Sequence, residues 1–378
     1  MNILLINYEF PPLGAGASNA TWNIGKELAR MGNSITVLTS GYKKNMGYGL
    51  EEEMTVFRCP AIRKKTSESN ILEMLLFIVS AFFFLPWIIV KHRTKGIIVF
   101  FSFPCGPLGL LSNLLFNIPY ITSLRGGDVP GNEKKLDGMH RLLMPLRRLI
   151  YRKSKSVIAN SNGLRFLAQK ADKVDISVIP NGVDTDFFTP SLQKKKSKYF
   201  EFLFTGRLSE QKNLLFLLHQ ISVLKNNTEK EIKLHIAGKG PLENKLKTYA
   251  EKLEISDCIT WYGWVDKHKI LSLCHRADCF INPSFNEGMP NAVLEAMACG
   301  LPVIASSVAG NKDIIEDRQN GFLFNPMDSN QLQKIFTEIM NDSKLLSETG
   351  ENARQTAKRD FSWQKAANDY LKLFQSKA

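Results

Sequence analysis

Pro283-Ser-Phe-Asn-Glu-Gly-Met-Pro-Asn-Ala-Val-Leu-Glu-Ala-Met-Ala-Cys-Gly-Leu-Pro302 is the stretch of this chain that decides its fold and its chemistry. It contains two carboxylates, Glu287 and Glu295, that lie eight positions apart. Pro290 suits the first position of a helix, and Gly300 suits the end of one. The pattern therefore predicts a loop that carries Glu287, followed by a helix that carries Glu295.

The start of this predicted helix is suited to binding an anion. The first N–H groups of a helix have no partner within the helix, and they attract phosphate groups. At a rise of about 1.5 Å per residue, roughly 7 Å separates Pro290 from Glu295. Glu287 and Glu295 would then flank the anion and accept hydrogen bonds from hydroxyl groups. The order suits a sugar, a diphosphate and a ribose in a row. The alternative is an ordinary amphipathic helix with two solvated glutamates.

The fold class is α/β, because short apolar runs alternate with longer helical patterns throughout. A chain of 378 residues exceeds one ordinary core, so we expect two doubly wound domains, residues 1–188 and 200–360. Polar, basic residues 189–199 are the expected linker, and residues 361–378 hold a last amphipathic helix. The predicted strands are residues 3–7, 34–39, 96–101, 120–124, 156–160 and 176–180, then 201–205, 233–237, 259–262, 279–282, 302–305 and 321–324.

Composition excludes several classes of protein. Six cysteines show no C-x-x-C pairing, which indicates reduced thiols of a cytosolic protein without a metal site. The amino terminus lacks the pattern of a signal peptide. The net charge of +13 is uneven, since residues 1–190 hold 23 basic and 14 acidic residues and the remainder 26 and 22. No nucleic-acid-binding signature accompanies this charge, so an anionic membrane or acceptor is the expected partner.

Two segments of the first half bear on that partner. The apolar residues 71–90 have the length of a membrane span, but Glu73 and Pro86 within them favour a crossover helix packed on a sheet. A helix that also docks on a bilayer is the second interpretation, and a true span the last. Residues 141–155 alternate basic and apolar side chains, as a helix lying on an anionic membrane would. A solvated helix face is the alternative.

Thr205-Gly-Arg-Leu-Ser-Glu-Gln-Lys-Asn213 follows the first predicted strand of the second half. Arg207 and Lys212 are thus expected in a strand-to-helix loop at the carboxyl edge of a sheet, where such folds bind ligands. A guanidinium and an ammonium there can stabilise a diphosphate leaving group without a metal ion. A solvated surface pair is the alternative.

Two loops of the first half follow predicted strands and contain candidate binding residues. The loop at residues 10–18 contains Gly14 and Gly16, which permit close approach of a ligand but lack the third glycine of a dinucleotide fingerprint. Leu124-Arg-Gly-Gly-Asp128 places Arg125 and Asp128 together. Asp128 is expected to orient Arg125 or to bind an acceptor hydroxyl. Arg125 itself cannot act as a base, so its role would be electrostatic or positional.

The turn at Asn181-Gly182 precedes Asp184 and Asp186, which make a D-x-D pattern. Such a pair can hold a divalent metal, but here it follows a turn rather than a buried strand. We therefore expect no metal site.

Taken in order, the glycine loop, N-G-V-D, G-R-x4-K and E-x7-E resemble the retaining glycosyltransferases of family 4, over nearly the whole chain. The resemblance implies the GT-B fold, with two Rossmann-like domains facing each other across a cleft, and a last helix that crosses back to the first domain. Many relatives carry His where this chain has Arg125, which is a departure from the pattern. The implied catalytic residues are Glu287, Arg207 and Lys212.

The resemblance also implies a donor site and an acceptor site. Gly238 and Val265, at the ends of two further strands, would flank the nucleotide base. Trp264 beside them is expected to pack rather than to stack on the base. The implied donor-binding residues are Gly14, Gly16, Arg207, Lys212, Gly238, Val265, Glu287, Gly288, Met289, Pro290, Asn291 and Glu295, and the implied acceptor or sugar residues are Arg125, Asp128 and Asn181.

The resemblance predicts a metal-independent retaining transferase without a cofactor. It would move a sugar from a UDP- or GDP-sugar to a glycan or lipid-linked glycan in bacterial surface polysaccharide synthesis. Its expected place is the cytoplasm, with a peripheral contact to the inner face of an anionic cell membrane, and nucleic acid is not an expected partner. The alternatives are a non-catalytic sugar-nucleotide-binding subunit of a transferase and a nicotinamide-dependent Rossmann enzyme.

Overall fold

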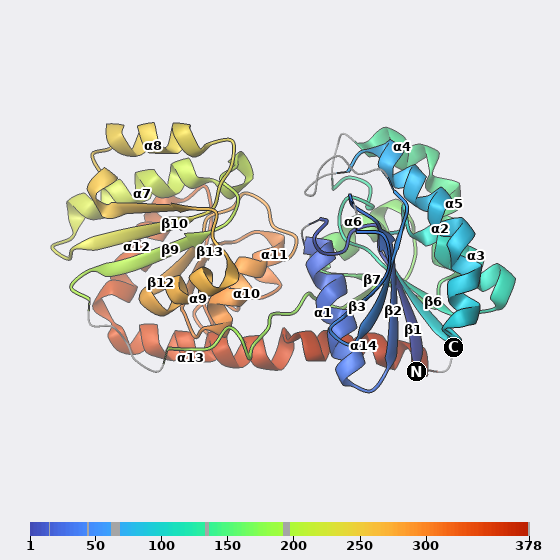
Figure 1. The fold of residues 1–378 in the computed structure, drawn as a ribbon. Coiled ribbons are helices and arrows are strands. Elements are labelled where there is room, and N and C mark those ends of the chain that lie inside the picture. Colours follow the sequence, from blue (N-terminus) through green and yellow to red (C-terminus); the bar gives the residue numbers. More distant parts are fainter. Residues whose placement is uncertain (15, 44, 62–68, 133–135, 192–196, 377–378) are drawn as a thin grey trace. The chain divides into compact units, whose positions relative to one another are not determined.

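The computed structural model describes residues 1–14, 16–43, 45–61, 69–132, 136–191 and 197–376 (Figure 1). The chain divides into two compact units. The first unit joins Met1–Gly182 to Trp363–Ala378, and the second unit is Val183–Ser362. Each unit contains one largely parallel sheet with helices around it, which confirms the α/β prediction. The last helix of the chain therefore belongs to the first unit.

The sheet of the first unit has the strand order β3-β4-β2-β1-β5-β6-β7-β8. Its central strands are buried on both faces, as parallel strands between helices must be. The predicted strands lie within two residues of the observed ones, but the hairpin β3–β4 was not predicted. The exposed, glycine-containing edge strand β3 gives little apolar signal. The bounds are β1 (Asn2–Ile6), β2 (Ser34–Ser40), β3 (Gly47–Glu51), β4 (Met54–Cys59), β5 (Gly96–Phe100), β6 (Tyr120–Ser123), β7 (Ser156–Ala159) and β8 (Ser177–Val178).

Helices cover this sheet, and α14 packs beside α1 although the two lie at opposite ends of the chain (Figure 1). Trp363 and Tyr370 of α14 are buried in the core of the first unit. The helices are α1 (Gly16–Arg30), α2 (Ile71–Lys91), α3 (Gly106–Phe116), α4 (Asp137–Leu142), α5 (Met144–Lys153), α6 (Asn162–Ala171) and α14 (Trp363–Gln375).

Helix α2 is the crossover between β4 and β5. A capping box starts it, in which Asn70 and Glu73 satisfy each other's backbone N–H groups. Phe77, Ala81 and Leu85 recur at every fourth position and are fully buried against the sheet. Among the described residues α2 is also the one helix long and apolar enough to cross a membrane. Its packing confirms the crossover-helix interpretation.

The sheet of the second unit is entirely parallel, in the order β11-β10-β9-β12-β13-β14. Every predicted strand lies within one residue of its observed bounds. The strands are β9 (Phe200–Thr205), β10 (Ile232–Ala237), β11 (Ile259–Gly263), β12 (Cys279–Asn282), β13 (Val303–Ser306) and β14 (Phe322–Phe324). The helices are α7 (Leu214–Asn227), α8 (Glu243–Lys252), α9 (Lys267–Arg276), α10 (Asn291–Ala298), α11 (Ala309–Lys312), α12 (Ser329–Asn341) and α13 (Ser343–Asp360), with short 3-10 turns η2 (Glu210–Lys212) and η3 (Ser256–Cys258).

The strand order of the second unit locates a ligand site. From β9 the chain proceeds outward through β10 and β11, and from β12 it proceeds the other way through β13 and β14. The direction therefore reverses between the neighbours β9 and β12. In open parallel sheets the crevice beyond the carboxyl ends of two such strands is where ligands bind. The loops after β9 and β12 are those that carry the predicted Arg207, Lys212 and Glu287.

Candidate functional site

The loops after β9 and β12 meet through an ion pair. The Nζ of Lys212, at the end of η2, lies 2.6 Å from Oε1 of Glu287 in the loop before α10. Both side chains are largely withdrawn from solvent, with 20% and 6% of their surfaces exposed. The structure thus brings together two residues that are 75 positions apart.

A buried polar shell holds the Glu287 carboxylate. Its Oε1 also accepts hydrogen bonds from Ser284 Oγ at 2.6 Å and Asn282 Nδ2 at 3.3 Å. Asn282 in turn donates to Asn311 Oδ1, and the side-chain amide of Asn311 donates to the carbonyl of Ser306. Such a satisfied network fixes the carboxylate in one orientation.

Sequence reasoning missed this shell. Asn282 ends β12, and Ser284 lies two residues further on in the following loop. A polar residue at the end of a buried strand is the sequence signal that could have identified both. Ser306 comes from β13 and Asn311 from α11, and neither carries a local signal of a role.

The start of α10 lies at the same sheet edge. Pro290 is the residue before the helix, which begins at Asn291, so the predicted first helical position is wrong by one residue. Fixed φ makes proline suitable at either place. Gly288 is exposed, and Met289 is half-buried. The helix ends at Ala298, and Gly300 adopts a φ of 68°, as expected of a helix stop.

A cavity of about 390 Å³ opens beside these loops in the second unit. Glu295, one turn inside α10, and Arg207, in the loop after β9, both line this cavity. Lys212 and Glu287 belong to the same two loops but are not among its lining residues. The predicted residues that line it are Arg207, Gly238, Val265, Asn291 and Glu295, and the others are Thr205, Gly206, Ala237, Lys239, Trp264, Ile270 and Ala292.

Two polar groups in this cavity are poised for a ligand. Burial raises the pKa of the Glu295 carboxyl from its ordinary value to about 7, because the protein surroundings disfavour the charged form. The side-chain oxygen Oδ1 of Asn291 is buried and has no hydrogen-bond partner among the described residues. A buried oxygen in this state gains free energy when a donor group reaches it.

The side chain of Trp264 is not packed as predicted. We expected a packing role, but 72% of the residue is exposed and its side chain lines the cavity. The prediction was wrong because the strand ends at Gly263, so Trp264 stands in the following loop. An exposed aromatic ring at the rim offers a face for stacking.

Gly238 has a structural reason to be glycine. Its φ is 148°, and an added Cβ would lie 1.8 Å from the carbonyl oxygen of Gly206. Backbone hydrogen bonds from Gly206 to Ala237 and from Leu208 to Lys239 join the two loops. The close approach positions the backbone of Arg207, which is exposed.

The predicted acceptor residues all lie in the first unit. The guanidinium of Arg125 donates to Asn181 Oδ1 at 2.7 Å and to the hydroxyl of Tyr370 at 3.2 Å. It also lies 4.8 Å from the centre of the Phe100 ring. Burial lowers the pKa of Arg125, opposed by Tyr370 and Asp128. The structure therefore joins Arg125 with Asn181 and adds Tyr370 of α14, which sequence reasoning missed.

Asp128 orients the backbone of this loop, not the side chain of Arg125. Its carboxylate accepts hydrogen bonds from the N–H groups of Ser102, Arg125 and Gly126 at 2.6, 2.9 and 3.0 Å. The expectation that it orients Arg125 therefore holds only for the main chain. Burial raises the pKa of Asp128, and the three N–H groups oppose that rise.

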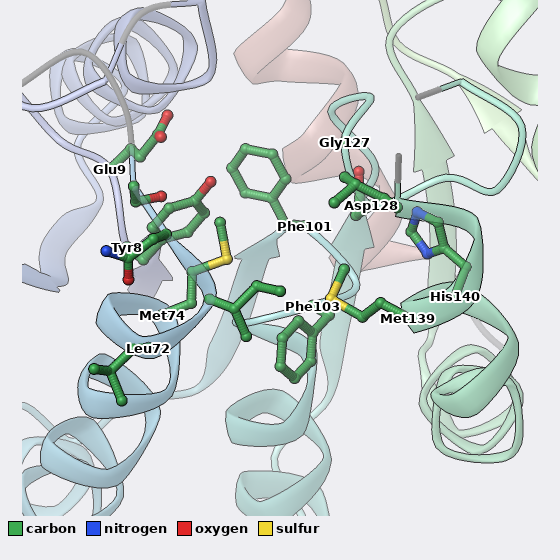
Figure 2. A pocket seen from close by; sticks show the side chains of 14 residues that line it. Tyr8, Glu9, Leu72, Met74, Phe101, Phe103, Gly127, Asp128, Met139 and His140 are labelled. Atoms are coloured by element: carbon green, nitrogen blue, oxygen red, sulfur yellow. The ribbon is translucent and has the colours of Figure 1, made fainter. Parts of the chain in front are cut away.

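A second cavity, of about 710 Å³, lies in the first unit and is shown in Figure 2. Tyr8 and Glu9 line it from the loop after β1, and Asp128 and His140 from the opposite side. Gly14 packs on Glu9, with a φ of 83°, whereas Gly16 starts α1 in open space. Ala15 between them lies outside the described residues. The apolar lining is Ile71, Leu72, Met74, Phe101, Phe103, Leu136 and Met139.

Among the described residues no group of three or more His, Cys, Asp or Glu side chains could hold a metal ion. In the D-x-D pattern, Asp184 Oδ1 accepts hydrogen bonds from the N–H groups of Asp186 and Phe187. This is the geometry of a turn that the Asp side chain caps. Asp184 therefore has a structural role.

Models of protein families match both halves of the chain. Residues 14–187 match Glycosyltransferase Family 4, and residues 187–356 match Glycosyl transferases group 1. Together the two matches leave only short segments at each end.

A relative from Escherichia coli, UDP-Gal:alpha-D-GlcNAc-diphosphoundecaprenol alpha-1,3-galactosyltransferase, is 31% identical over 54% of this chain and 54% of its own length. The chain thus spans about half the length of this relative.

Solved structures of low identity share the fold. Sucrose-phosphate synthase from Thermosynechococcus elongatus superposes with a TM-score of 0.81 at 20% identity, over 99% of this chain and 98% of that one. Anabaena HepE, solved in complex with UDP and glucose, superposes with a TM-score of 0.73 at 18% identity, over 100% of both chains.

Proposed function

This chain is a member of the family 4 glycosyltransferases and has their GT-B fold, and we propose that it transfers a sugar from a nucleotide-diphosphate sugar to a glycan with retention of configuration. The observation that carries the proposal is the site of the second unit. There Arg207, Asn291 and Glu295 line one cavity beside the Lys212–Glu287 ion pair.

The donor would lie along the start of α10. Arg207 and Lys212 bring two positive charges to the diphosphate, and the first N–H groups of α10 add a partial positive charge. Glu295 accepts hydrogen bonds from the ribose, and Trp264 offers a face to the base. HepE is described as bound to UDP and to UDP-glucose, which favours a uridine nucleotide, with a GDP-sugar as the alternative.

The Lys212–Glu287 ion pair can persist while both side chains bind the donor. Among the described residues, every hydrogen bond to the Glu287 side chain falls on Oε1. Its Oε2 can accept from a sugar hydroxyl while the shell holds Oε1. Lys212 keeps two further N–H donors for the diphosphate.

The acceptor would occupy the cavity of the first unit. Its lining includes the polar groups of Glu9, Asp128 and His140, and most of the remaining lining is apolar. This mixture suits a sugar attached to a lipid. The E. coli relative's name specifies a diphosphoundecaprenol acceptor, so we take a lipid-linked glycan of surface polysaccharide synthesis as the acceptor. An enzyme that uses such an acceptor would work at the inner face of the cell membrane.

The chemistry follows as a displacement on one face of the sugar. The bond from the anomeric carbon to the diphosphate oxygen breaks, and its electron pair leaves on the diphosphate, where Arg207 and Lys212 stabilise it. The acceptor oxygen bonds to the same face, and its proton passes to the departing diphosphate oxygen. No covalent intermediate forms, so trapping a glycosyl–enzyme adduct would contradict this mechanism.

The test is donor hydrolysis and transfer with a panel of UDP- and GDP-sugars. Arg207→Ala and Lys212→Ala should lower the rate by about 100-fold or more, because each removes a charge from the leaving group. Glu287→Ala should also remove most activity. The matched control is Lys245→Ala, an exposed cation of α8, which should leave the rate unchanged. Added EDTA should also have no effect, because the two cations replace a metal.

Near-normal rates in all three site variants would refute the site assignment. A rise in melting temperature with UDP, without hydrolysis of any donor, would indicate a non-catalytic sugar-nucleotide-binding subunit. A rise with NAD and none with UDP would indicate a nicotinamide-dependent enzyme.

A further inference from the structure

We propose that the outward faces of α2 and α3 form a surface that docks on an anionic lipid bilayer. We call it the docking face, and its apolar part consists of Leu72, Leu75, Val79, Phe82, Phe83, Trp87 and Val90 of α2 with Leu114, Leu115 and Phe116 of α3. Docking requires no transfer chemistry, so the inference goes beyond the proposed function.

Helix α2 is apolar on two opposite faces. The buried face, with Phe77, Ala81 and Leu85, packs on the sheet. Apart from the adjacent pair Phe82 and Phe83, the exposed residues recur at intervals of three and four positions, and they form a continuous stripe along the other face. Phe83 is 72% exposed and Val90 is 68% exposed. In a soluble protein, a contiguous apolar stripe of this length marks a surface that a partner or a membrane covers.

The stripe carries no acidic charge. Glu73 is the one acid of α2, and it is buried in the capping box at the start of the helix. Helix α3 has no charged residue at all. Because α2 packs against α3 and α3 against α5, the three lie side by side (Figure 1). The exposed end of α3 therefore widens the stripe.

Cations border the docking face on two sides. Lys91, Arg93 and Lys95 are exposed at the end of α2, and Arg152 and Lys153 at the end of α5. A second copy of this chain would bring like charges together around such a face. Anionic headgroups would instead complement the cations while acyl chains receive the apolar stripe. Charge complementarity thus favours a bilayer as the occupant.

Aromatic residues at the cationic end fit the level of the headgroups. Trp87 and Tyr48 of β3 pack with ring centres 5.3 Å apart, and both are partly exposed. The Nζ of Lys91 lies 4.2 Å from the centre of the Tyr48 ring and 4.7 Å from that of Trp87. Trp, Tyr and Lys concentrate at the membrane–water interface. The helix therefore lies in the plane of the interface, because its other face is held in the core.

The docking face adjoins the cavity of the first unit. Leu72 belongs to both, since it is 65% exposed and also lines the cavity (Figure 2). A lipid held in the bilayer beneath the face could thus present its head to that cavity. This last step rests on the proposed function, whereas docking itself does not.

A fluorescent label tests the docking face directly. All six native cysteines are buried, so an introduced exposed cysteine reacts selectively. Phe83→Cys carries an environment-sensitive dye on the docking face. Phe166→Cys carries it on α6 at a matched exposure, 67% against 72%. With vesicles containing phosphatidylglycerol, the dye at position 83 should shift to the blue, and the dye at 166 should not.

Vesicle sedimentation gives the energetic test. Phe82→Gln with Phe83→Gln should lower binding at least about tenfold, because two rings no longer enter the acyl region. Phe166→Gln is the control and should bind as the wild type does. Arg152→Gln with Lys153→Gln should lower binding to anionic vesicles roughly fivefold per cation at low salt, and leave binding to neutral vesicles unchanged.

Three results would overturn the inference. They are equal dye responses at positions 83 and 166, wild-type binding no greater than that of the double Phe variant, and a stable dimer in solution that the double Phe variant dissociates. Donor hydrolysis is measured on the same samples. Vesicle binding without hydrolysis would refute the proposed function and leave the docking face supported.

Discussion

At the scale of single residues, the site depends on charges that are partly removed from water. Lys212 and Glu287 each compensate the other, and Ser284 and Asn282 complete the shell. Removing one partner of a largely buried ion pair leaves the charge of the other partner uncompensated. The resulting loss of stability exceeds the stability that the intact pair contributes. The residues that form the site therefore also stabilise the fold.

Lys212→Met should lower both activity and stability. The free energy of unfolding should fall by about 1–3 kcal/mol, because the buried Glu287 carboxylate loses its cation. The double variant Lys212→Met with Glu287→Leu should recover most of this loss without recovering activity. Urea unfolding and donor hydrolysis measure the two effects. Additive losses of stability in the double variant would show that the two side chains are not coupled.

The affinity for the donor should depend on pH through Glu295. Its pKa is raised to about 7 in the folded protein, so the group is mostly protonated below that pH and a carboxylate above it. Only the carboxylate accepts from both ribose hydroxyls. Binding that requires it should tighten roughly tenfold between about pH 6 and pH 8.

A nucleotide sugar is the right probe for this pH dependence, because its diphosphate does not titrate in the range. Calorimetry with wild type and Glu295→Gln measures it, and the variant should show a flat profile. The same raised pKa makes the fold less stable as pH rises from the ordinary carboxyl value to about 7, since the unfolded chain releases this proton first. Equal pH profiles in the two proteins would contradict the assignment of Glu295.

At the scale of elements, loops after parallel strands carry the site because strand ends meet at one edge of the sheet. Glycines let these loops approach one another. The loop at Gly238 packs on Gly206, and Gly310 of α11 packs on the backbone of Glu287 and Gly288. Side-chain chemistry at this edge thus depends on backbone contacts between elements.

Gly238→Ala should disturb the second unit and its cavity. The substitution needs a left-handed backbone and places Cβ against the Gly206 carbonyl, so it should cost about 1–3 kcal/mol and weaken donor binding. Gly138→Ala is the matched control, because its Cβ meets nothing within 4 Å. Thermal unfolding of the two variants makes the comparison. Equal melting temperatures would mean that the Gly238 loop relaxes without strain.

At the scale of the whole molecule, the chain builds two units and returns to the first with its last helix. Tyr370 of α14 reaches Arg125 and Ser123, over separations of 245 and 247 positions. The amphipathic pattern of residues 361–378 predicts a helix but not the surface that it covers. A simple terminal helix of the second half has the same pattern, and only the packing against α1 and the first core distinguishes the two.

Local patterns along the chain predict the α/β architecture, twelve of the fourteen strands in the described residues and, to within one residue, the helix start at Asn291, because apolar periodicity and turn residues act over a few positions. The contacts that cross the sheet edge, namely the Lys212–Glu287 pair and the Asn311 shell, follow only from the folded arrangement of the strands. The tertiary structure also decided that Trp264 stands exposed and that only one face of α2 is buried. These outcomes depend on which strands become neighbours, and that order follows from the packing of the whole unit rather than from any local pattern.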